Sequence, residues 1–318
     1  LNMDDGTLDT YSHTGKGGAT AYVGASDASI SLLGVDVSSA TAKANATSNA
    51  YIAGTVIDEG DISVLSQGAS IADATIGNGS SVEFIGVGVA HVSAEAAGAF
   101  NAYIDTDVRD SAGTALSSIE MTPDDVSVNA FYYAVARASV ASPDGGVTVE
   151  GSALSAEVNI ACSNVTTQAI AAILGGGSIG SDSASAGDIT VKVQGYTLSL
   201  ASVASSTISF SGVKIAANAL TAELSSLQQA FIQNATVYAS TVTISSVLND
   251  TTYCIDTVTL SLTRTTGTNT RYGGAYAIHG GNGLNVSLAS VAVNSASATS
   301  NAKGYAYTDG AITEITGT

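Results

Sequence analysis

The chain has 318 residues and a formal net charge of −18, with 9 Lys and Arg against 27 Asp and Glu. This acidic balance argues against nucleic acid or an anionic membrane surface as a partner. Only 11% of the residues are charged, yet 45% are hydrophobic and most of these are small. The composition therefore excludes a disordered chain, and it also excludes a thick core built on large side chains.

Short cores of the form apolar–polar–apolar recur along the chain, and each predicts a β-strand. In chain order they begin at residues 30, 62, 82, 126, 147, 189, 208, 242, 258 and 286. Several steps between them are about 20 residues, and others are about twice that. Two cores follow nearly identical turns, GDISV at 60–64 and GDITV at 187–191, in which Gly supplies positive φ and Asp caps the turn. A step of about 20 residues is typical of one coil of a β-solenoid.

The sequence thus predicts an all-β fold, an elongated β-solenoid of the parallel β-helix type with irregular rungs of about 20 residues. A β-sandwich filament subunit that donates a strand to its neighbour is the alternative all-β interpretation. We expect residues 1–318 to form a single elongated repetitive β domain, with a weak sub-boundary near 175–187. The chain starts at LNMDDGT and stops at AITEITGT, where a β-like alternation is still running, which indicates a segment of a longer chain.

A slower repeat, in which Ala precedes an aromatic and then an apolar residue, overlays the first. AYI stands at 50–52 and again at 102–104, with AYV at 21–23, AFI at 230–232 and AYT at 306–308 as related copies. Between the two AYI copies come an acidic turn, GDISV, a run of small residues and IGVGVA. This order resembles the repeats of very large bacterial surface proteins of the filamentous-adhesin type, including leukotoxin-like and haemagglutinin-repeat proteins, and residues 50–104 follow it best. The resemblance implies an exported, elongated β-helical stalk or adhesive fibre, and it carries over no catalytic residues.

The stretch VEFIGVGVAHVSAEAAGAFNAYI at 82–104 shows how such strands would pack. A period of two places small residues on one face, namely Gly86, Gly88, Ala90, Val92, Ala94 and Ala96. We expect this face to pack closely against another sheet. The opposite face turns polar at His91, Ser93 and Glu95, and we expect it to emerge into solvent there.

One segment, residues 217–232, has a different pattern. Leu220, Leu224, Leu227 and Phe231 are spaced four, three and four residues apart, which predicts a short helix. A strand also fits, because Ala222 alternates with Leu220 and Leu224.

No residues form a recognisable catalytic constellation. His13, His91 and His279 match no zinc or triad spacing, and no G-x-S-x-G motif has a partner His, so we predict a protein that is not an enzyme. Acidic turns could supply several of the carboxylate oxygens that calcium prefers, and the candidate ligands are Asp58, Glu59, Asp61, Asp105 and Asp107. Asp is equally common at turns that bind no metal. Cys162 and Cys254 could form one disulfide in an oxidising compartment, or remain free thiols.

These features predict a structural component of an extracellular filament or cell-surface adhesin that assembles along its axis. Self-association is the main expected interaction, with a glycan or another cell-surface partner as a second, and no transmembrane helix is expected. The alternatives are a discrete pilus-like subunit that polymerises by donor-strand exchange and a calcium- or glycan-binding surface module. A polysaccharide lyase or hydrolase on the same scaffold is disfavoured by the scarcity of basic residues and the absence of Trp.

Overall fold

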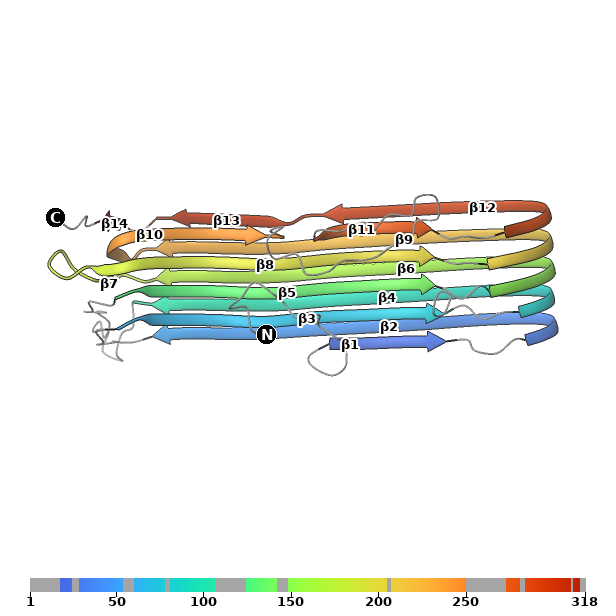
Figure 1. Ribbon diagram of the computed structural model, residues 1–318, viewed down its shortest axis with the longest axis horizontal. Helices are drawn as coiled ribbons and strands as arrows, with labels where there is room; N and C mark the ends of the chain where they lie inside the picture. Colours follow the sequence, from blue (N-terminus) through green and yellow to red (C-terminus); the bar gives the residue numbers. More distant parts are fainter. Residues whose placement is uncertain are drawn as a thin grey trace.

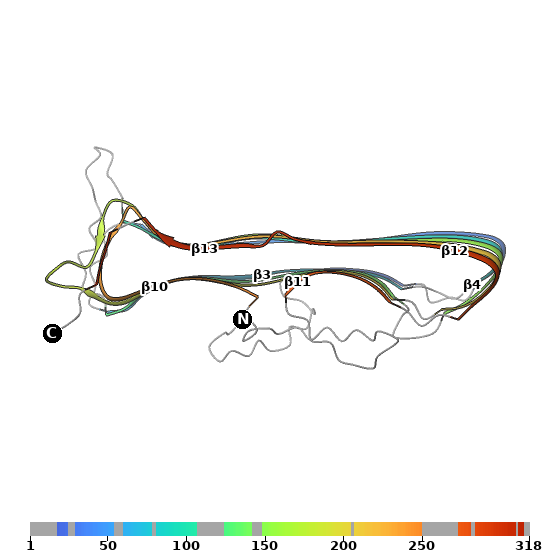
Figure 2. The same cartoon turned by 90° about the horizontal axis from the view of Figure 1, so that it is seen from above.

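The structure is a computed structural model that describes residues 18–24, 29–53, 60–77, 81–106, 124–141, 148–204, 207–249, 273–280, 284–309 and 311–314. All named elements in these ranges are β-strands, as the sequence predicts, and they form two sheets that lie face to face along their length (Figures 1 and 2).

The first sheet has the spatial order β1 (Gly18–Gly24), β3 (Ile62–Gly77), β5 (Val126–Ala141), β8 (Ala186–Ala204), β10 (Thr236–Leu248) and β14 (Ala311–Glu314). In addition, β11 (Gly274–Gly280) pairs with β8, and β7 (Ser178–Ile179) pairs with β10. Residues 175–187, where a weak sub-boundary is expected, contain β7 and a short turn closed by a bridge between Ser181 and Ala184.

The second sheet has the order β12 (Leu284–Ser300), β9 (Thr207–Gln233), β6 (Thr148–Leu174), β4 (Ser81–Asp105) and β2 (Ser29–Ala53), and β13 (Lys303–Thr308) also pairs with β9. From β1 to β6 the chain alternates between the two sheets at every strand (Figure 1). All ladders between the named strands are parallel. This geometry does not fit the sandwich alternative, because β-sandwiches are built from antiparallel strands.

The sequence predicts that stacked positions are about 20 residues apart, and this separation is wrong. Ala50 pairs with Ala102 and Ala102 pairs with Ala171, so one full coil is more than twice as long as the predicted rung. The short step instead links the two sheets, because the core that begins at Ile62 lies in the first sheet and the core that begins at Val82 lies in the second. Each pass of the chain crosses both sheets in long strands, of which β3 has 16 residues and β4 has 25.

Four copies of the slower Ala-aromatic repeat stack on one another. The ladders bring Ala50, Ala102, Ala230 and Ala306 into one column of the second sheet, with Ala171 between Ala102 and Ala230. The copy at 21–23 instead lies in β1 of the first sheet. On the outer face beside this column, Tyr51 stacks on Tyr103 with ring centroids 5.2 Å apart, and Phe231 stacks on Tyr307 at 5.0 Å.

The interior between the sheets is thin because most residues that face it are small. As predicted for 82–104, Ala90, Val92, Ala94 and Ala96 are buried. Serine hydroxyls even reach the backbone of the opposite sheet. Ser66 of β3 donates to the Ser48 carbonyl of β2 at 2.8 Å, which Ala- and Gly-rich packing makes possible. On the other face of β4, Val87 is exposed like His91, and Ile85 and Val89 are half-buried, so this face is already partly open to solvent before it turns polar.

Two large aromatic side chains interrupt this small-residue core. Phe100 of β4 and Tyr132 of β5 are buried and stacked, with centroids 5.3 Å apart. Glycines make the room, since a Cβ at Gly68 would collide with the Phe100 ring and a Cβ at Gly195 with the Tyr132 ring.

The predicted helix at 217–232 is wrong, because this segment lies within β9 and pairs with β6 on one side and with β12 and β13 on the other. Leu220, Ala222 and Leu224 all face the interior and are at most 2% exposed. Backbone pairing on two sides and burial of this alternating set outweigh the helix-like spacing of the leucines.

Candidate functional site

Two of the candidate calcium ligands are among the described residues. Both lie at the end of the stack where the chain leaves a second-sheet strand and enters a first-sheet strand. Asp61 precedes β3, and Asp105 is the last residue of β4. Asp58, Glu59 and Asp107 lie outside the described residues.

The Asp61 carboxylate already has a role in the stack. Its Oδ1 accepts a hydrogen bond from the backbone N–H of Asp125 at 3.2 Å, and Asp125 Oδ1 accepts one from the N–H of Asp188 at 2.8 Å. Each Asp therefore caps the start of the next first-sheet strand. Within the described ranges no group of three or more His, Cys, Asp or Glu side chains is placed to hold a metal ion, and the calcium site stays a prediction.

Cys162 lies on β6 as a free, half-buried thiol, and Cys254 lies outside the described residues, so their disulfide stays a prediction. Burial raises the pKa of the Cys162 thiol, and the nearby negative charge of Glu223 raises it further. Both effects keep the thiol protonated at neutral pH and lower its reactivity.

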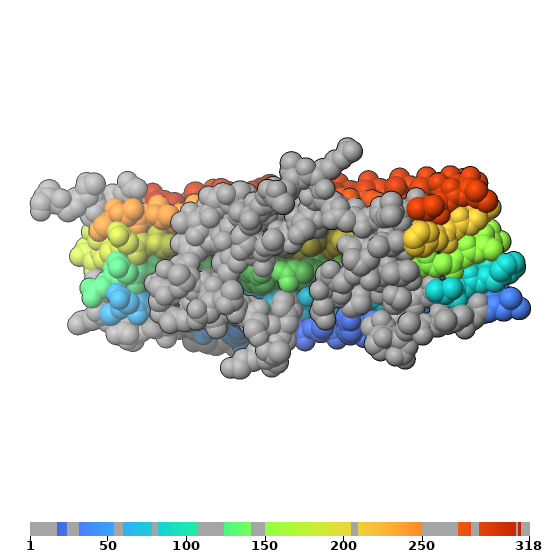
Figure 3. All heavy atoms as spheres, turned by 45° about the vertical axis from the view of Figure 1, so that its right-hand side comes forward, coloured from blue at the N-terminus to red at the C-terminus, as the bar shows by residue number. Residues whose placement is uncertain are grey.

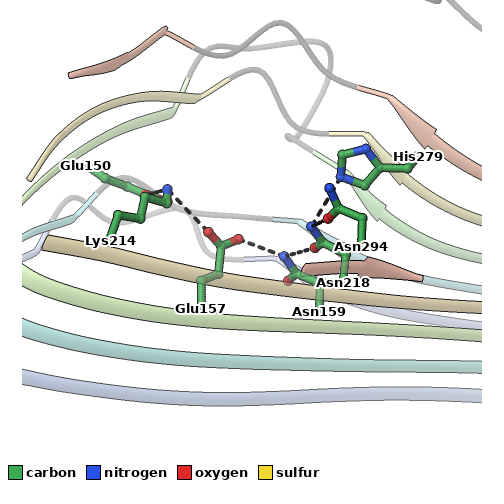
Figure 4. Close-up of polar contacts among 7 residues, drawn as sticks. All are labelled: Glu150, Glu157, Asn159, Lys214, Asn218, His279 and Asn294. Carbon is green, nitrogen blue, oxygen red and sulfur yellow. Dashed lines mark hydrogen bonds and ion pairs between the residues drawn. The ribbon is translucent and has the colours of Figure 1, made fainter. Parts of the chain in front are cut away.

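A cluster of charged side chains joins the neighbouring strands β6 and β9 (Figure 4). Lys214 of β9 places its Nζ 3.3 Å from Glu150 Oε2 and 3.5 Å from Glu157 Oε2, both on β6. The Lys214 side chain is only 12% exposed. Burial raises the pKa of Glu150, repulsion by Glu157 adds to this effect, and Lys214 opposes it. One ammonium thus neutralises two partly buried carboxylates on the neighbouring strand.

A ladder of amide side chains continues from this cluster (Figure 4). Asn159 of β6, Asn218 of β9 and Asn294 of β12 occupy one column. Asn159 Nδ2 donates to Asn218 Oδ1 at 3.0 Å, and Asn218 Nδ2 donates to Asn294 Oδ1 at 2.7 Å. Asn159 Nδ2 also donates to Glu157 Oε1 at 2.8 Å, which joins the ladder to the charged cluster.

His279 of β11 links this ladder to the first sheet, with its Nε2 3.2 Å from Asn218 Nδ2. Every contact described for the cluster and its ladder joins residues of one strand, neighbouring strands of the stack, or the two sheets. Sequence reasoning missed both features, because their members lie on different coils, far apart in the chain, and share no local motif.

The outermost strands of the second sheet form a second candidate site. In the described part of the chain β2 pairs only with β4, and β12 pairs only with β9, so each has one edge without a strand partner. Ala296 and Ala298 of β12 belong to interior-facing columns, yet both are exposed, whereas Ala222 beneath Ala298 is buried. The last strand therefore offers both backbone groups and an uncovered small-residue face.

The described residues contain no helix long and apolar enough to cross a membrane. No family model, curated protein sequence or solved structure matches the chain significantly.

Proposed function

We propose that this protein is a non-catalytic structural element of an extracellular filament or cell-surface adhesin, with a β-solenoid fold that assembles along its axis. Alternation of the chain between two parallel sheets supports the solenoid. The composition, rich in small and polar residues and poor in Lys, supports an extracellular location.

The match between the two end edges of the stack carries the assembly proposal. The ladders connect residues of β12 and β13, at one end of the second sheet, to residues of β2 at the other end. Val291 shares a column with Val35, Ala298 with Ala42, and Tyr307 with Tyr51. In the first sheet, Ala277 of β11 shares a column with Ala21 of β1. A second copy placed on the β12 edge would therefore continue each of these four columns with the same type of residue.

Physical chemistry favours this continuation. A long edge strand presents a row of N–H and C=O groups to a strand from another chain. The new ladder would give β12, with 17 residues, a second partner, and each backbone hydrogen bond contributes about 0.5–1.5 kcal/mol net. Stacking would also bury the exposed alanines of β12 and would let Asn294 extend the amide ladder to Ser38 of the next copy.

A charge on the interior-facing side of β12 tests the proposal. Ala298→Lys places an ammonium where the next copy would close the interior, whereas Ser297→Lys places it on the outer face of the same strand. Both residues are exposed, so both variants should fold. We expect electron microscopy to show axial stacks for the wild type and Ser297→Lys, and single short particles for Ala298→Lys. Single particles for all three proteins, or equal stacks for all three, would contradict axial assembly through this edge.

A further inference from the structure

The outer face of the second sheet carries a stripe of apolar side chains that runs along the stack. One column contains Val35, Val87, Ala156, Ile215 and Val291, one residue from each of β2, β4, β6, β9 and β12. The next column begins at Leu33 and the one after it at Val37, and both continue with only Val, Ile, Leu and Ala. We call these three columns the outer stripe.

The outer stripe is exposed on the two outermost strands and exposed or half-buried on the strands between them. Val35 on the first strand is 66% exposed, Val87 on the next is 38% exposed, and Val293 on the last is 61% exposed. A contiguous apolar patch of this kind is as large as the largest patch on a typical monomer, about 300–600 Å², and such patches often mark interaction sites.

The stripe extends toward the bend. The ladders skip Leu32, Phe84, Ala153, Gly212 and Leu288, which lie near the starts of the second-sheet strands. Figure 1 shows these strands bending near their starts. Leu288 at this bend is 94% exposed, and Phe84 is exposed as well. Figure 3 shows the bend end of the stack, with the successive coils one above another.

The size of the stripe is close to what a specific interface needs. Five strands spaced by about 4.8 Å and three columns spaced by about 7 Å cover roughly 500 Å² on one copy. Two such faces together bury about 1,000 Å², which is near the lower limit for a specific protein–protein interface.

Charge also constrains the partner. The stripe contains no charged residue in a protein of net charge −18. Among the described residues, the nearest outward-facing column with charges holds Lys43, Glu95 and Glu223, and in it Lys43 and Glu95 form an ion pair at 2.8 Å. An anionic lipid surface would be repelled by the rest of the molecule, and no row of Lys or Arg among the described residues borders the stripe to attract it. A flat, uncharged sheet face is instead complementary to another flat, uncharged sheet face, with the two sheets about 10 Å apart.

We propose that the outer stripe pairs with the outer stripe of a second copy, so that two solenoids associate side by side. This deepens the proposed function and rests on it, because axial stacking would join the stripes of successive copies into one continuous band. The lateral area then grows with each copy, so single copies pair weakly and stacked copies pair firmly.

The test uses two double variants with equal added charge on the same strands. Val87→Lys with Ile215→Lys places two ammonium groups in the middle of the stripe. Ser93→Lys with Thr221→Lys places them on the same outer face, three columns away in register. Thermal unfolding of both variants checks that the fold is kept.

Electron microscopy gives particle width and length, and sedimentation velocity gives the pairing constant. We expect wild type and Ser93→Lys/Thr221→Lys to form double-width particles. The stripe variant should form single-width particles of unchanged length, with pairing weakened about tenfold or more. Flotation with neutral phosphatidylcholine vesicles tests whether the outer stripe binds a lipid surface instead of a second copy.

Width and length separate the two proposals. Single-width wild-type stacks, or equal pairing by both variants, would overturn lateral pairing and leave axial assembly intact. Wild-type particles of double width that are only one copy long would overturn axial assembly alone. Wild-type protein that floats with vesicles and loses this binding in the stripe variant would assign the stripe to lipid and overturn pairing.

Discussion

Removal of one buried hydroxyl, in Tyr132→Phe, should measurably weaken the fold. The Tyr132 oxygen lies 2.6 Å from Ser226 Oγ and accepts a hydrogen bond from Gln228 Nε2 at 3.0 Å, between β5 and β9. All three side chains are buried. Gln228 cannot easily turn away, because its Oε1 accepts a hydrogen bond from Ser246 at 3.1 Å.

The magnitude follows from these contacts. Phenylalanine keeps the ring stack on Phe100 but leaves a buried amide N–H of Gln228 without its acceptor. Two hydrogen bonds contribute about 0.5–1.5 kcal/mol each, and an unsatisfied buried donor costs about 1–3 kcal/mol. The two figures describe the same lost interactions and are not added, so we expect the free energy of unfolding to fall by about 1–3 kcal/mol.

Denaturant unfolding measures this loss, and hydrogen exchange of the β5 and β9 amides locates it. The control is Tyr51→Phe, since Tyr51 is exposed and stacks through its ring, so its effect should stay within about 0.5 kcal/mol. Equal effects of the two substitutions would refute the argument that the buried network stabilises the contact between the sheets.

Two further predictions concern the charged residues. The pKa of Glu150 is raised in the folded protein, so its stability contribution is present below its unfolded pKa of about 4.5 and is lost as pH rises through the folded value. Glu150→Gln should therefore remove part of the decline in unfolding free energy between acid and neutral pH, and a pH profile identical to that of the wild type would contradict this. Asp61→Ala should lower stability by about 1 kcal/mol whether calcium or a chelator is present, because Asp61 caps the Asp125 N–H. A loss seen only with calcium would instead identify Asp61 as a metal ligand.

Local sequence patterns determined the strand type and which faces are buried. Period-two alternation acts over a few residues, so it identified the interior face of 82–104 from Ala90 to Ala96 without knowledge of the rest of the chain. The Ala-aromatic repeat likewise marked positions that stack in the second sheet, at 50–52, 102–104, 230–232 and 306–308, although its copy at 21–23 lies in the first sheet.

The same patterns gave a wrong rung length and a wrong helix. Cores in the two sheets look alike, so a step between sheets cannot be distinguished from a step between stacked positions by spacing alone. Residues 217–232 have leucines at helical spacing, and only the neighbouring strands β6 and β12, which are distant in the sequence, hold them in a ladder.

What the tertiary structure alone decided is the register between coils. Ala50 pairs with Ala102 in the β2–β4 ladder, whereas Ala216 pairs with Ala292 in the β9–β12 ladder. The sequence separation of paired positions therefore changes along the chain, and no fixed period predicts which side chains meet. The Lys214 cluster, the amide ladder and the outer stripe all depend on this register.

The sequence by itself determined that the chain forms strands with one small-residue face. The lengths of the intervening strands and turns decided which residues of those strands stand above one another, because backbone hydrogen bonds fix a parallel ladder only once the coil has closed.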